Sequence, residues 1–114
     1  IGEIHDDPLT RKAMAQTLSA IRGAQIILHV IDAHLFGQAD GLSDPQEGDL
    51  DMQLAAFAGP RGGYCIVANK MDLPGAKRGL ARIRRLFTGY KVLAVSAATR
   101  EGLKEVRRHV LHNL

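Results

Sequence analysis

The chain has 114 residues, 46% of them hydrophobic and 24% charged, and a formal net charge of +3. These values are typical of one small globular domain and exclude a disordered tail. Cys65 is the only cysteine, which excludes a disulfide scaffold, and the longest apolar run (residues 26–31, interrupted by His29) is too short to cross a membrane. With no signal peptide visible, we expect a cytoplasmic protein.

The first part of the chain predicts a helix, a strand and a loop. The Asp-Pro pair at 7–8 is typical of a helix start, and apolar residues then recur at helical spacing until Gly23: Met14, Leu18 and Ile21. Residues 25–33 are β-branched and apolar on both faces, as in a buried parallel strand. Residues 34–48 are rich in Gly, Pro, Asp and Ser and predict a loop.

The second part predicts three helices and two strands. Apolar residues at helical spacing mark each helix. The first stops near Gly59 and carries Leu50, Leu54 and Phe57, and the second follows the turn at 74–75 and carries Leu80, Ile83 and Phe87. The final helix carries Leu103, Val106, Val110 and Leu114. Residues 64–68 and 91–95 predict strands. Helices alternating with strands indicate an α/β fold with a mainly parallel sheet and helices on both faces.

Polar motifs follow the second and third predicted strands, at the sheet edge where open α/β sheets bind ligands. Residues 69–72 read N-K-x-D, and residues 96–98 read S-A-A. An ionised Asp72 can accept two hydrogen bonds from N1–H and N2–H₂ of guanine. Asn69 can donate to N7 or tie the two loops together, and the stem of Lys70 can lie on the flat face of the base.

The other loop completes this predicted site. The backbone N–H of Ala97 can donate to guanine O6, an acceptor that adenine lacks, and the small residues Ser96, Ala97 and Ala98 let the backbone come close to the base. The alternative is that Asn69 and Asp72 are only turn residues before Pro74. That alternative leaves the S-A pair after the next strand as a coincidence.

The segments ILHVIDA, VANKMDLPGA and VSAATREGL resemble, in order and separation, the later strands of a translation-factor-class P-loop GTPase of the Obg, Era and TrmE group. The resemblance covers nearly the whole chain and implies a three-layer P-loop GTPase-like fold. Residues 1–114 would form the C-terminal half of its nucleotide-binding domain, from the helix after switch II to the C-terminal helix, with the P-loop half absent. The guanine site, for GTP or GDP, would comprise Asn69, Lys70, Asp72, Ser96, Ala97 and Ala98, with Ser96 orienting Asp72.

The sequence departs from that family where phosphate would bind. No G-x-x-x-x-G-K-S/T motif occurs, and no D-x-x-G precedes the first helix. Those elements hold the phosphates and Mg²⁺ in this class, so we expect the segment alone to be inactive and Mg²⁺ to bind only in an intact GTPase. Because the chain starts at Ile1 and has no Met before Met14, we expect it to be internal to a longer protein.

The charge distribution suggests a second function class. Residues 32–51 contain six acidic residues and no Lys or Arg, whereas residues 77–108 contain ten of the 15 Lys and Arg. The alternative hypothesis is therefore a non-enzymatic GTPase-like domain that binds RNA or a protein through basic helices; ordinary solvated helix faces would explain the same charges. The resemblance implies the ribosome or RNA as further partners, and an exposed edge of strand 25–33 predicts dimerisation.

Other residues give weaker signals. Asp32 could be a phosphoryl acceptor, but no acids end an earlier strand. His109 and His112 have a spacing that suits a metal, although solvated imidazoles are the simpler interpretation. His29 is predicted to be a packed core residue and Cys65 a small buried one. His5, with its acidic neighbours, is interpreted either as part of a switch segment or as a frayed terminus.

Overall fold

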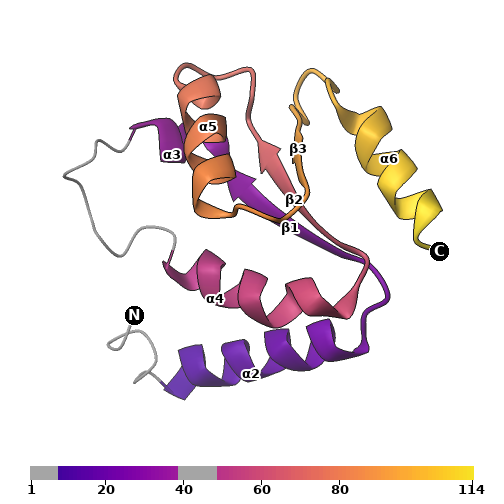
Figure 1. The fold of residues 1–114 in the computed structure, drawn as a ribbon. Coiled ribbons are helices and arrows are strands. Elements are labelled where there is room, and N and C mark those ends of the chain that lie inside the picture. The colour runs from indigo at the N-terminus through magenta and orange to yellow at the C-terminus, as the bar shows by residue number, and fades with distance from the viewer. Residues whose placement is uncertain (1–7, 39–48) are drawn as a thin grey trace.

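A computed structural model describes residues 8–38 and 49–114, which form a three-stranded sheet covered by helices (Figure 1). The elements follow in the order α2 (Pro8–Gly23), β1 (Ile27–Asp32), α3 (Ala33–Gln38), α4 (Asp49–Ala58), the 3₁₀ helix η1 (Gly59–Arg61), β2 (Tyr64–Asn69), α5 (Ala76–Leu86), β3 (Val92–Ala94) and α6 (Leu103–His112). The predicted α/β class is confirmed. The predicted start at Asp7 and the candidate His5 lie outside the described residues.

The sheet is parallel throughout, with strand order β1-β2-β3. β1 and β2 run in register from Ile27 opposite Tyr64 to Asp32 opposite Asn69, and β3 pairs with residues 66–68 of β2. All three strands therefore end at the same edge, as predicted. That edge carries the residues that follow Asp32, Asn69 and Ala94.

The central strand β2 divides the core into two layers. Ile66 and Ala68 join a cluster with residues of α3, α4 and α5, including Phe36, Ala55 and Ile83. Cys65 and Val67 point to the other face, where Val95 and, on α6, Val106 pack against them. In Figure 1, α6 accordingly lies on the opposite side of the sheet from α3 and α5.

The predicted apolar faces are correct for α2 and α5, whereas in the other two helical stripes Leu50, Leu103 and Leu114 are exposed. In α2 the half-buried side chains include Met14, Leu18 and Ile21, and Ile21 packs against the main core. No helix in residues 8–38 and 49–114 combines the length and apolar character that a membrane crossing requires.

The loop prediction for residues 34–48 is wrong at its start, because Ala33–Gln38 form the helix α3. The end of the first strand is also corrected, since β1 stops at Asp32 and Ala33 begins α3. Asp32 caps this helix: its Oδ1 accepts the backbone N–H of Leu35 at 2.9 Å. Residues 39–48 of the predicted loop lie outside the described part of the chain.

Candidate functional site

Two loops meet at the carboxyl ends of β2 and β3. The 69–75 loop connects β2 to α5, and the 96–99 loop follows the end of β3. Their backbones are joined at the base, where Val95 N–H donates to Ala68 O at 2.8 Å and Met71 N–H donates to Val95 O at 3.1 Å. The sheet therefore holds the N-K-x-D and S-A segments side by side.

Ser96 links the two loops through a buried hydroxyl. Its side chain is completely buried, and its Oγ donates to Asp72 Oδ1 at 2.7 Å while accepting the backbone N–H of Thr99 at 3.1 Å. One oxygen of the carboxylate is thereby fixed. Since no other described residue bonds to Asp72, its second oxygen remains a strong acceptor for a ligand.

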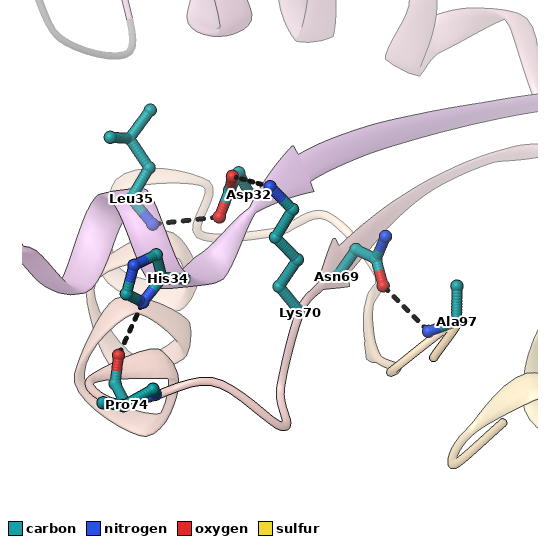
Figure 2. Close-up of polar contacts among 7 residues, drawn as sticks. All are labelled: Asp32, His34, Leu35, Asn69, Lys70, Pro74 and Ala97. Atoms are coloured by element: carbon teal, nitrogen blue, oxygen red, sulfur yellow. Dashed lines mark hydrogen bonds and ion pairs between the residues drawn. The ribbon is translucent and has the colours of Figure 1, made fainter. Parts of the chain in front are cut away.

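Asn69 makes the second link. Its Oδ1 accepts the backbone N–H of Ala97 at 3.1 Å, as Figure 2 shows. This is the loop-tying role considered for Asn69, and it leaves the side-chain NH₂ as a donor. The Ala97 N–H is the group expected to face guanine O6, so a bond to O6 requires this N–H to be shared with Asn69 or released from it.

A pocket of about 360 Å³ opens where the loops meet. Its lining contains five of the six predicted site residues and Leu73: Asn69, Lys70, Asp72, Leu73, Ala97 and Ala98. The sixth, Ser96, is buried behind Asp72. Larger hollows of about 440 and 580 Å³ lie along the basic helices α5 and α6, but basic side chains line them and neither lining contains a carboxylate.

Asp32, which the sequence suggested only as a phosphoryl acceptor, is a neighbour of this site through Lys70. Lys70, whose backbone is left-handed with φ 69°, places its Nζ 2.8 Å from Asp32 Oδ2 (Figure 2). Partial burial acts to raise the pKa of Asp32, but the hydrogen bonds from Lys70 and from the Leu35 N–H lower it below its ordinary value. The available sequence signal was that Asp32 and Asn69 each end an apolar strand segment, since the ends of parallel strands meet at one edge.

The histidines and the cysteine lie elsewhere. His29 is a packed core residue, as predicted: its Nδ1 is 2.7 Å from the Tyr64 hydroxyl and its Nε2 is 2.8 Å from Asp51 Oδ1. The interpretation of His109 as solvated is wrong, because it is buried and its Nε2 lies 3.1 Å from Gly63 O. Cys65 is fully buried, as predicted, and burial raises the pKa of its thiol.

A metal site is not evident in the part of the chain that the structure describes. Within residues 8–38 and 49–114, His, Cys, Asp and Glu side chains form no group of three or more that could hold a metal ion. We assign no metal ligand to any described residue.

Comparison with known proteins finds relatives across most of the chain. No protein-family model matches. Proteins named GTPase Obg are similar: that of Desulfitobacterium hafniense (strain DSM 10664 / DCB-2) is 40% identical over 83 residues, 72% of this chain and 20% of the relative. That of Bacillus pumilus is 34% identical over 100 residues, 87% of this chain and 23% of the relative. That of Heliobacterium modesticaldum is 38% identical over 85 residues, 74% of this chain and 19% of the relative. The chain spans about a fifth of the length of these relatives.

Proposed function

We propose that this chain is the base-recognition segment of a GTP-binding P-loop GTPase related to the proteins named GTPase Obg. The similarity to those relatives supports a GTPase segment, and the three-stranded parallel sheet is consistent with part of a P-loop GTPase fold. In this proposal the guanine of GTP or GDP occupies the pocket between the 69–75 and 96–99 loops. Asn69, Lys70, Asp72, Ser96, Ala97 and Ala98 form its binding site.

The observation that carries the proposal is the pair of bonds that link the two loops. Ser96 orients Asp72, and Asn69 holds the Ala97 backbone, so four residues from two strand ends form one polar surface. Simple turn residues would need no such bonds to another loop. The arrangement fixes a carboxylate, an amide and a backbone N–H around a common pocket before a ligand arrives.

The pocket offers the groups that distinguish guanine from adenine. Asp72 accepts from N1–H and N2–H₂, the NH₂ of Asn69 donates to N7, and the Ala97 N–H donates to O6. Adenine presents neither two adjacent donors nor the O6 acceptor at this edge. The stem of Lys70 and the methyl groups of Ala97 and Ala98 supply apolar contact with the flat ring.

Phosphate binding, Mg²⁺ and GTP hydrolysis are proposed for the whole GTPase and not for these residues. The G-x-x-x-x-G-K-S/T motif that holds the phosphates in this class does not occur in the 114 residues. A cytoplasmic location and association with RNA or the ribosome stay predictions. The placement of residues 1–114 in the C-terminal half of the nucleotide-binding domain also stays a prediction.

Replacing Asp72 with Asn in the full-length protein tests the proposed site. The variant loses a charged acceptor for two guanine donors, which is worth about 1.5–3 kcal/mol, or roughly ten- to a hundredfold in GDP affinity. Calorimetry with GDP measures this change. Asp49→Asn removes the same charge from the start of α4 and serves as the control. Unchanged GDP affinity in Asp72→Asn would contradict the proposal.

A further inference from the structure

The 69–75 loop is held on two sides. The 96–99 loop bonds to Asn69 and Asp72 on one side, and α3 with the end of β1 holds the other. There Asp32 pairs with Lys70, and Nδ1 of His34 donates to the carbonyl of Pro74 at 2.7 Å (Figure 2). The chain between Lys70 and Pro74 is thus anchored at one end to the last residue of β1 and at the other end to α3.

The α3 helix packs closely against α5. A Cβ atom added to Gly37 would collide with the carbonyl oxygen of Gly75, and one added to Gly79 would collide with that of Ala33. Backbone therefore packs directly on backbone between these helices. Arg82 of α5 adds a bond to the carbonyl of Phe36 at 3.0 Å. The start of α3 is consequently packed closely against α5, and the end of α3 against Gly75 of the 69–75 loop.

The Asp32 carboxylate divides its two oxygens between α3 and the loop. Oδ1 accepts the Leu35 N–H at 2.9 Å, which fixes the carboxylate on the helix, and Oδ2 accepts from Lys70 Nζ at 2.8 Å. Lysine has a flexible four-carbon stem that samples many rotamers when its ammonium has no partner. Anchoring the ammonium restricts the stem, and Lys70 is one of the residues that line the pocket.

We infer that Asp32 is a positioning residue for the base site: by holding the Lys70 ammonium across the strand ends, it fixes the Lys70 stem as a wall of the pocket. This inference rests on the proposed function, because it assigns Lys70 a contact with the base. It adds a residue from β1 to a site otherwise built from the two loops that follow β2 and β3. Asp32 touches Lys70 and not the base.

The test is Asp32→Asn in the full-length protein, with GDP binding measured by calorimetry. Asparagine keeps an oxygen that can accept the Leu35 N–H, so the helix cap is retained while the ion pair is lost. Both side chains are partly exposed, at 51% for Lys70 and 31% for Asp32, so we expect a modest, roughly two- to fivefold loss of GDP affinity. Asp49→Asn, the matched charge control, leaves the affinity unchanged.

Two further readouts separate positioning from a general structural effect. The loss in Asp32→Asn shrinks as NaCl is raised from about 0.05 to 1 M, because salt screens the pair that the variant lacks. In a Lys70→Met background, Asp32→Asn has no additional effect, because the partner is already gone. If Asp32→Asn folds poorly, Lys70→Met replaces it as the test, because it removes the same ion pair at the more exposed residue. Lys70→Met by itself should then show the loss of GDP affinity and its dependence on salt.

Measuring Asp72→Asn in parallel distinguishes a failure of the guanine site from a failure of the positioning role of Asp32. If Asp72→Asn loses GDP affinity while Asp32→Asn stays at the wild-type value, the role of Asp32 is overturned and the guanine site stands. Additive losses from Asp32→Asn and Lys70→Met, or a loss independent of salt, also overturn it. If Asp72→Asn binds GDP normally, the guanine site is wrong and the inference fails with it.

Discussion

Ser96 shows how a single buried hydroxyl connects structure to specificity. It is fully buried, and it bonds both to the Asp72 carboxylate and to the Thr99 N–H, so it shapes its own loop and orients the neighbouring one. Its small size is also needed for the close approach of the two loops. Neither role could be filled by alanine, which preserves the size but not the bonds.

Ser96→Ala is therefore expected to weaken GDP binding in the full-length protein. The Asp72 carboxylate loses its orienting partner, a hydrogen bond to a charged group worth about 1.5–3 kcal/mol, so the affinity falls roughly tenfold or more. Calorimetry measures the change against Ser19→Ala on the exposed face of α2. Equal GDP affinity in the two variants would show that Ser96 does not orient the carboxylate.

Asp32 gives the protein an acid-sensitive contact. Its pKa is lower in the folded protein than its ordinary value of 3.8, so the unfolded chain binds a proton more readily. The stabilisation is complete above about pH 5 and is lost as the pH falls through the folded pKa. We expect the difference in unfolding free energy between wild type and Asp32→Asn to shrink as the pH falls from 5 to 3, measured by urea unfolding. A difference that stays constant over this range would contradict the ion pair.

The helix α3 illustrates what the sequence could not predict. Residues 33–38 form six helical residues that include Gly37, too short a segment to be stable alone. Its stability comes from Asp32 at its start and from close backbone packing on α5, both of which appear only in the folded chain. The strands were easier to predict because residues 25–33 and 64–68 are apolar on both faces, which local sequence reveals.

The candidate site likewise has a part that the sequence predicted and a part that it did not. The N-K-x-D and S-A segments were recognised because each directly follows a buried strand, and parallel strands bring those positions to one edge. The partner of Lys70 was missed because it lies 38 residues away on a different strand. His109 was misjudged although it falls three residues after Val106, on the helical face that packs toward the sheet.

Gly79 tests the contact between α3 and α5. Gly79→Ala places a methyl group against the carbonyl oxygen of Ala33, so backbone must move. We expect a loss of about 1–3 kcal/mol in unfolding free energy, the usual range for overpacking, measured by urea unfolding of the full-length protein. Gly23→Ala, at the end of α2 with nothing within 4 Å of the added atom, is the control. Equal stability of the two variants would mean that α3 is not seated as described.

On the scale of the whole molecule, the basic segment is split between two sides. The basic helices α5 and α6 pack against opposite faces of the sheet, so the ten basic residues of 77–108 do not lie on one helix face. This arrangement favours solvated helix faces over a single continuous polyanion-binding surface. RNA binding stays a prediction.

The other whole-molecule feature is the outer edge of β1. Among the described residues no strand pairs with that edge, and Val30 on this strand is 59% exposed. Unpaired apolar edges recruit other chains, so the isolated 114-residue chain is expected to dimerise or aggregate. Val30→Lys should reduce this association in light-scattering measurements. Leu111→Lys, at a position on α6 that is 60% exposed, controls for added charge. A monomeric wild-type chain would contradict the prediction.

The most direct measurement of the central claim is the base preference of Asp72→Asn in the full-length protein. Xanthine carries a carbonyl where guanine has its N2 amino group, so it needs a donor opposite that position, and asparagine supplies one while still accepting from N1–H. Calorimetry should show that wild type prefers GDP over xanthosine diphosphate and that Asp72→Asn reverses the order. A variant that keeps the wild-type preference would show that Asp72 does not read the base.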